Sequence, residues 1–151
     1  MTVRITTLVP GLTSRYGNPT LDCGSAQLRA QCRHLATVVT IEGDINVVNV
    51  GPIGEYIRRF ILAKHHVVLD LSGVDAFDAP CVSLLYVLDE ASRAAGVEWT
   101  LVAGQAVSER IGDHDEAVFP IARSAQEALS YLADVIVRRR EMLLPLFDKT
   151  A

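Results

Sequence analysis

The 151-residue sequence is poor in cysteine, and its three cysteines follow no recognisable metal-binding or disulfide pattern. Cys23, Cys32 and Cys81 include no CxxC pair, so the sequence indicates neither a disulfide framework nor a zinc site. The sequence also lacks a signal peptide and any apolar run long enough to span a membrane. We therefore expect a cytoplasmic protein whose thiols stay reduced.

Positive charge is scarce as well. The 14 lysines and arginines are outnumbered by 18 acidic residues, which gives a net charge of −4. A general nucleic-acid binder presents a basic face to the phosphates, so this class is not favoured. Because 50% of the residues are hydrophobic and 21% are charged, the composition is that of a globular protein rather than a disordered one. The length suits one domain.

The common catalytic signatures are missing too. The sequence has no glycine-rich phosphate loop, no GxSxG motif and no HExxH motif, and no nucleophile is evidently paired with a base. His65 and His66 are adjacent at the start of an expected strand, where alternation sends them to opposite faces and makes them a poor metal pair. The sequence therefore predicts a protein that is not an enzyme and that holds neither a metal nor a cofactor.

Apolar periodicity and turn residues divide the chain into alternating strands and helices. Residues 1–25 are rich in turn formers and are expected to be irregular. We expect strands, the first and last of them at sheet edges, at residues 27–36, 36–43, 65–73, 97–104 and 117–122. We expect helices at residues 49–63, 78–95, 105–112 and 125–144. This order predicts an α/β domain with crossover helices.

Several of these helices carry terminal signals. Asn49 and Asp78 are expected to be N-caps, and each is followed by a proline in the first helical turn. Ser124 and Glu127 form an S-x-x-E capping box before the last helix. Pro145 is expected to end that helix.

Acidic and amide side chains concentrate in two expected turns. Glu42, Asp44 and Asn46 follow one strand, and Asp75 and Asp78 follow the next. Because sites gather at the carboxyl ends of the strands in an α/β sheet, we expect these two turns to lie side by side. Two interpretations remain open. The cluster is a surface that faces a partner, or Asp78 only caps its helix while the other side chains are solvated.

The C-terminal residues leave further alternatives open. Arg138–Arg140 could contact an acidic partner or a membrane surface, or they could simply stabilise the carboxyl end of a helix through its dipole. The apolar segment MLLPLF, residues 142–147, could pack back on the domain or form a homodimer contact.

The order of motifs resembles the STAS family, the sulfate-transporter and anti-sigma-factor-antagonist domains. The resemblance runs from about residue 27 to about residue 135, and its most specific stretch is VVLDLSGVDAFD, residues 67–78. Asp70, Ser72 and Asp78 match the motif in which an apolar strand is followed by Asp-Leu-Ser and a later Asp. The resemblance implies a single domain over residues 26–151, with a mixed sheet of four or five strands, about four helices and an extended C-terminal helix.

The resemblance also implies a function. Stand-alone bacterial STAS proteins are anti-sigma factor antagonists, which bind an anti-sigma factor of kinase-type ATPase fold so that it releases its sigma factor. In this family a serine or threonine directly after the motif Asp is phosphorylated by that partner, and the added charge abolishes binding. Such a protein regulates transcription by binding, without catalysis.

This sequence departs from the family pattern at the phosphorylation site. Ala79 and Pro80 stand in the places of the hydroxyl residue and its neighbour, Cys81 replaces the usual glycine, and Asn46 replaces the last acid of the first turn. We therefore expect no phosphorylation at position 79. Ser72 and Ser83 are the nearby hydroxyls. The expected partner surface consists of Asp44, Asn46, Asp75, Asp78, Ala79, Pro80, Cys81 and Ser83.

Without the usual switch, the protein would always be competent to bind, or it would be controlled by its abundance, by a partner or by the redox state of Cys81. Two other functions fit a STAS domain. One is a sensory module that binds a small ligand near the start of the helix at residue 78. The other is a scaffold subunit in a signalling assembly.

Overall fold

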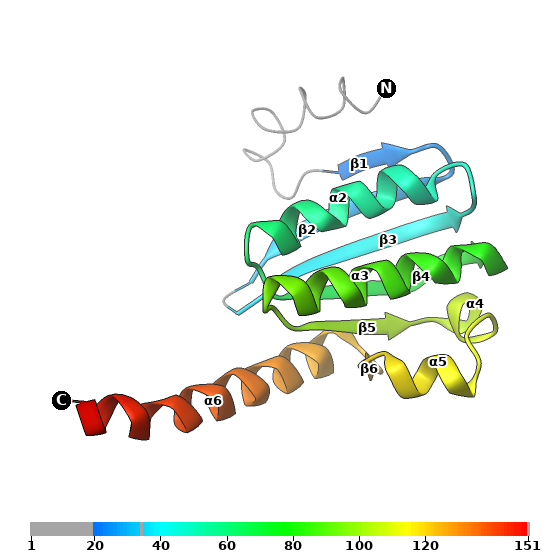
Figure 1. The fold of residues 1–151 in the computed structure, drawn as a ribbon. Coiled ribbons are helices and arrows are strands. Elements are labelled where there is room, and N and C mark those ends of the chain that lie inside the picture. The colour runs from blue at the N-terminus through cyan, green and yellow to red at the C-terminus, as the bar shows by residue number, and fades with distance from the viewer. Residues whose placement is uncertain (1–19, 34, 151) are drawn as a thin grey trace.

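The fold is a mixed sheet with helices on both faces (Figure 1). A computed structural model describes residues 20–33 and 35–150, with side chains up to residue 140. Within these residues the sheet contains six strands in chain order, β1-β2-β3-β4-β5-β6. They are β1 Thr20–Cys23, β2 Ala26–Cys32, β3 Thr37–Ile45, β4 Val67–Phe77, β5 Trp99–Ala103 and β6 Ile121–Ala122. The first three strands pair antiparallel, and β3 to β6 pair in parallel.

Helices connect the parallel strands. They are α2 Val50–Leu62, α3 Val82–Ala95, α4 Gln105–Ser108 and α5 Asp113–Val118, and α6 Ala125–Thr150 follows the last strand. The short 3-10 helix η2, Ala79–Cys81, leads directly into α3. The predicted α/β class is confirmed, although the described residues contain six strands where four or five were expected.

Two cores hold the layers together. The larger core lies between α2, α3 and one face of the sheet, and it includes the isoleucine stripe Ile53, Ile57 and Ile61 of α2. The smaller core lies on the other face, where Ala128 and Leu132 of α6 contact the sheet. Strand β4 contributes to both, since adjacent residues point to opposite faces, which confirms the prediction that this strand is covered on both sides.

The N-terminal region predicted to be irregular, residues 1–25, includes a strand near its end. Residues Thr20–Cys23 form β1, which pairs with β2. Leu21 and Cys23 of β1 are buried, and the two-residue connection Gly24-Ser25 turns the chain back, with a φ of +62° at Gly24. Strand β2 therefore lies inside the sheet rather than at its edge, contrary to the prediction. Four alternating residues are too few for a reliable strand signal. The rest of that N-terminal region, residues 1–19, lies outside the described part of the chain.

Two other strands differ in extent from the predictions. Strand β4 continues through the expected turn to Phe77, because it keeps pairing with β3. Part of the expected strand at residues 117–122 belongs to α5, whose first turn is capped by Asp115 accepting from the Gly112 N–H (2.9 Å). Only Ile121–Ala122 form β6, which does lie at the sheet edge as predicted.

Helix α6 begins as predicted but continues past its expected end. The Ser124 hydroxyl accepts from the Glu127 N–H (3.1 Å), and the Glu127 carboxylate accepts from the Arg123 N–H (3.1 Å). The helix passes through Pro145 and ends at Thr150. Proline removes one helical hydrogen bond and its ring crowds the carbonyl four residues earlier, so it disfavours a helix interior, but its fixed φ near −65° is itself helical and a helix can continue through it. In Figure 1 the distal part of α6 extends away from the sheet.

Candidate functional site

The two acidic turns lie side by side, as predicted. In the β3–β4 register, Asp44 pairs with Ala76 and Ile45 pairs with Phe77. The Asp78 N–H then donates to the Ile45 carbonyl (3.1 Å), which extends the contact beyond the two strands. The carboxyl ends of β3 and β4 therefore bring residues 44–46 and 75–80 to the same edge of the sheet.

The first turn is held by Asn49, whose side chain does not act as the predicted cap. Its Nδ2 group donates to the carbonyls of Asp44 (2.8 Å) and Cys23 (3.1 Å), and its Oδ1 atom accepts from the Asn46 N–H (2.9 Å). Asn49 is only 5% exposed. Because these bonds join the turn to the β1–β2 hairpin, Asn49 fixes where the first turn lies.

Asn46 stabilises the same turn from the other side. Its Oδ1 atom accepts from the Val48 N–H (2.9 Å) and from the Asn49 N–H (3.2 Å), while its Nδ2 group donates to the Ser25 hydroxyl (3.3 Å). An aspartate could accept the same two bonds but could not donate to Ser25. The departure from the family pattern at Asn46 therefore has a structural use in this chain.

A glycine is required at position 43 because β3 comes close to the Gly24-Ser25 connection between β1 and β2. Its φ is +98°, and a Cβ atom there would lie 2.2 Å from the Ser25 carbonyl oxygen. A residue with a side chain would be strained by both the backbone conformation and the contact. The same carbonyl accepts from the Asp44 N–H (3.0 Å).

In the second turn, Asp78 occupies the N-cap position of η2 but makes no capping hydrogen bond with its side chain. The physical reason is local. Pro80 has no N–H to offer, and the Cys81 N–H donates to the Asp78 backbone carbonyl instead (2.9 Å). Asp78, Ala79 and Pro80 are all exposed, so the Asp78 carboxylate is presented to solvent.

Cys81 lies in the core, with no exposed surface. The sequence placed it on the partner surface, but its side chain packs beneath that surface and supports it. Burial and the nearby Asp78 carboxylate raise the pKa of the Cys81 thiol. The thiolate is the reactive form, so a raised pKa does not support a redox role for this cysteine.

The hydroxyls near the site are already hydrogen-bonded. Ser83 is exposed, and its hydroxyl donates to the Pro80 carbonyl (2.9 Å). The Ser72 hydroxyl donates to Asp70 Oδ1 (2.6 Å), and the Ser72 N–H donates to the same oxygen (3.0 Å). The Asp70 carboxylate therefore links the Asp-Leu-Ser motif within β4, at the point where the register of β4 against β3 shifts.

Three residues beside the carboxyl ends of β3 and β4 were not among the site residues predicted from the sequence. Val47 and Val48 are 63% and 83% exposed in the connection between β3 and α2, directly after Asn46. Two consecutive apolar residues in an expected turn were the available signal. The third is Arg110, whose Nε–H donates to the Phe77 carbonyl (2.9 Å) and which places a cation beside the acidic turns. No local pattern links residues 33 positions apart.

The arginine run and the apolar segment singled out near the C-terminus both lie on α6. Arg138, Arg139 and Arg140 are exposed on α6, and Arg139 forms an ion pair with Glu98. The segment at residues 142–147 is helical, but its side chains lie outside the described part of the structure. In the part of the chain that the structure describes, no helix is both long and apolar enough to cross a membrane.

Comparisons with known proteins agree with this fold. The profile of the STAS domain matches residues 27–128. Osmosensory protein A of Mycobacterium tuberculosis is 48% identical over 158 residues, which cover 97% of this chain and 100% of that protein.

Solved structures give the same result. An anti-sigma factor antagonist from Mycobacterium paratuberculosis superposes with a TM-score of 0.64 and 21% identity, over 72% of this chain and 95% of that one. The unphosphorylated anti-sigma factor antagonist SpoIIAA superposes with a TM-score of 0.59 and 12% identity, over 71% of this chain and 96% of that one. On the family match and the 48% identity, the chain belongs to the STAS domain family.

Proposed function

We propose that the chain is an anti-sigma factor antagonist that acts in the cytoplasm by binding an anti-sigma factor of kinase-type ATPase fold. The contact surface, here called the Asp78 surface, comprises Asp44, Asn46, Asp75, Asp78, Ala79, Pro80 and Ser83. Membership of the STAS family and the names of the similar solved structures support this class of function. The adjacent positions of the two turns support a single continuous contact.

The observation that carries the proposal further is the exposed Ala79 at the start of η2. The family resemblance puts the phosphorylated hydroxyl at this position, and a methyl group cannot accept phosphate. The partner's kinase activity therefore cannot place a doubly charged group in the centre of the Asp78 surface. The complex with the anti-sigma factor therefore persists in the presence of ATP, and its formation is controlled by something other than phosphorylation at position 79.

The neighbouring hydroxyls do not replace the missing acceptor. Ser72 would have to release Asp70, and Ser83 would have to release the Pro80 carbonyl, before either could enter a kinase active site. Ser83 also lies within α3, and a kinase would have to unwind the first turn of that helix. Both requirements disfavour phosphorylation.

The test uses the full chain and each kinase-type anti-sigma factor from the organism that encodes it. Complexes are measured by calorimetry with and without ATP, and phosphate is located by mass spectrometry. We expect one partner to bind and the complex to survive ATP. Ala79→Ser should gain phosphate and then lose the partner, whereas Ala94→Ser, on the exposed face of α3 near its other end, should do neither.

Two results would overturn the proposal. Failure to bind any of these anti-sigma factors would remove the antagonist function. Phosphate on the unmodified chain between residues 72 and 83, accompanied by loss of the complex, would remove the claim that this site has no switch.

A second candidate function is a sensory one, because a relative 48% identical to this chain is named an osmosensory protein. In that case the affinity for the partner would depend on the osmotic conditions. Repeating the calorimetry over a series of sucrose concentrations tests this candidate. An affinity that does not change across the series would reject it.

A further inference from the structure

A second site lies at the opposite end of α3 from the Asp78 surface. It is a cavity of about 290 Å³ bounded by the C-terminal half of α3, the start of β5, Pro120 and Arg139 of α6. In Figure 1 this is the region where α6 leaves the sheet and passes below the end of α3. The cavity is independent of the proposed partner contact.

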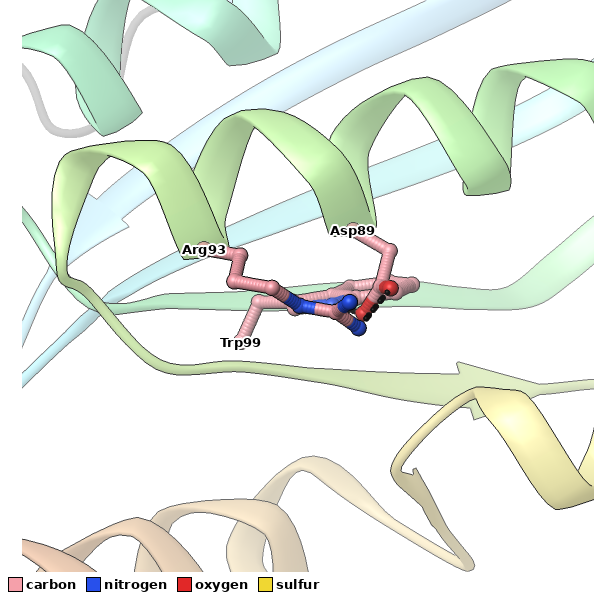
Figure 2. A network of polar contacts seen from close by, with 3 residues as sticks. All are labelled: Asp89, Arg93 and Trp99. Carbon is pink, nitrogen blue, oxygen red and sulfur yellow. Dashed lines mark hydrogen bonds and ion pairs between the residues drawn. The ribbon is translucent and has the colours of Figure 1, made fainter.

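Charges of both signs line the cavity, and they balance. Arg93 Nη2 donates to Asp89 Oδ2 (2.8 Å), and the Trp99 indole N–H donates to the other oxygen of the same carboxylate (3.0 Å). Figure 2 shows Asp89 and Arg93, both from α3, converging with Trp99. On the far side, Arg139 pairs with Glu98. The two cations and two anions leave no net charge, so the cavity offers no advantage to a simple anion or cation.

The charged groups also have unused binding capacity. A guanidinium carries five N–H donors, and Arg93 and Arg139 each use one in the ion pairs. The guanidinium side chains are 77% and 53% exposed, whereas the carboxylates of Asp89 and Glu98 are 16% and 23% exposed. A ligand can therefore meet the exposed cations at the rim and the less exposed anions further in.

The strongest sign of a ligand is Ser92, which also lines the cavity. This residue is 1% exposed, and its hydroxyl has no hydrogen-bond partner among the residues described. Nearly all buried polar groups in native proteins have a partner, so an unpartnered hydroxyl on the wall of a polar cavity calls for one. The hydroxyl oxygen itself has less than 1 Å² of accessible surface, so a polar ligand supplies the partner only after the Ser92 side chain turns toward the cavity.

We propose that this cavity binds a small zwitterion with the chemistry of a free amino acid. Its carboxylate binds the guanidinium groups of Arg93 and Arg139, and its cationic group lies beside Asp89 and Glu98. Ser92, once its side chain has turned toward the cavity, donates to or accepts from the ligand. Because Arg139 belongs to α6, the bound ligand also links that helix to the body of the domain.

The chain provides its own reporter for this proposal, since Trp99 is its only tryptophan. Fluorescence of the full chain is followed while glycine, L-alanine, L-serine, L-proline, L-glutamine or glycine betaine is added. We expect a saturable change with at least one of these zwitterions. N-acetyl-L-serine and L-serine methyl ester, which each lack one of the two charges, should give none.

Substitutions then place the binding in the cavity. Arg139→Gln and Ser92→Ala should each weaken the binding by about tenfold or more, while Arg140→Gln, a neighbour on the same helix outside the cavity, should leave it unchanged. The proposal is overturned if no zwitterion in the set gives a saturable change, or if binding survives both substitutions. It is also overturned if sodium chloride gives the same change, since the response is then one of ionic strength.

Discussion

Asn49 should contribute more to the stability of this protein than any propensity scale suggests. Replacing it with alanine removes four hydrogen bonds, to Asp44, Cys23, Asn46 and, at 3.5 Å, Ser25, from a residue that is 5% exposed. A hydrogen bond contributes about 1 kcal/mol net, and a buried partner left unsatisfied costs at least as much. We therefore expect Asn49→Ala to lower the free energy of unfolding by about 3 kcal/mol.

The measurement is urea denaturation followed by circular dichroism, with Gln126→Ala, an exposed position on α6, as the control. The control should change the free energy of unfolding by less than about 0.5 kcal/mol. If Asn49→Ala lies as close to the unmodified chain as the control does, the hydrogen bonds contribute nothing and the reasoning is refuted.

A second variant, Asn49→Asp, tests the two hydrogen bonds that the Asn49 amide group donates to backbone carbonyls. Ionised aspartate keeps the acceptor but points a negative oxygen at the two carbonyls that the amide group served. This raises the pKa of the new carboxyl in the folded state, so the protonated form, which can donate, is preferred there. The stability of this variant should therefore increase as the pH falls towards 4, relative to the unmodified chain. A constant difference across the pH series would contradict the proposed geometry.

Three further predictions concern other parts of the fold. Gly43→Ala should cost about 2 kcal/mol or more in urea denaturation because of the positive φ and the close carbonyl, whereas Gly51→Ala, in open space on α2, should be neutral or stabilising. Burial lowers the pKa of His66, so its neutral form is favoured in the folded state. Stability should therefore be lost as the pH falls below about 6.5, and His66→Gln should reduce that loss in thermal melts. In mass-spectrometric iodoacetamide labelling, exposed Cys32 should react in the native protein and buried Cys81 only after unfolding, and equal rates would contradict the assigned burial.

Much of the framework could be predicted from local sequence. The isoleucine spacing of α2 predicts its buried face, and the stretch VVLDL predicts a strand covered on both sides. The adjacency of the two acidic turns was also predictable, because parallel strands end at the same edge of the sheet. The exposed partner surface on that edge stays a prediction for all its residues, and Cys81 is buried beneath it.

The sequence by itself determined helices α2 and α3, the start of α6, strands β3, β4 and β5, and the absence of a hydroxyl at position 79, since each depends only on residue type and short-range periodicity. Tertiary structure decided what Asn49, Arg110 and Ser92 do. Asn49 and Cys23 are 26 residues apart, and Arg110 and Phe77 are 33 apart, so their hydrogen bonds exist only once the strands have paired. The cavity beside Ser92 likewise requires α3, β5 and α6 to meet. Local patterns report which face of an element is buried, but only packing decides which polar groups on different elements face each other.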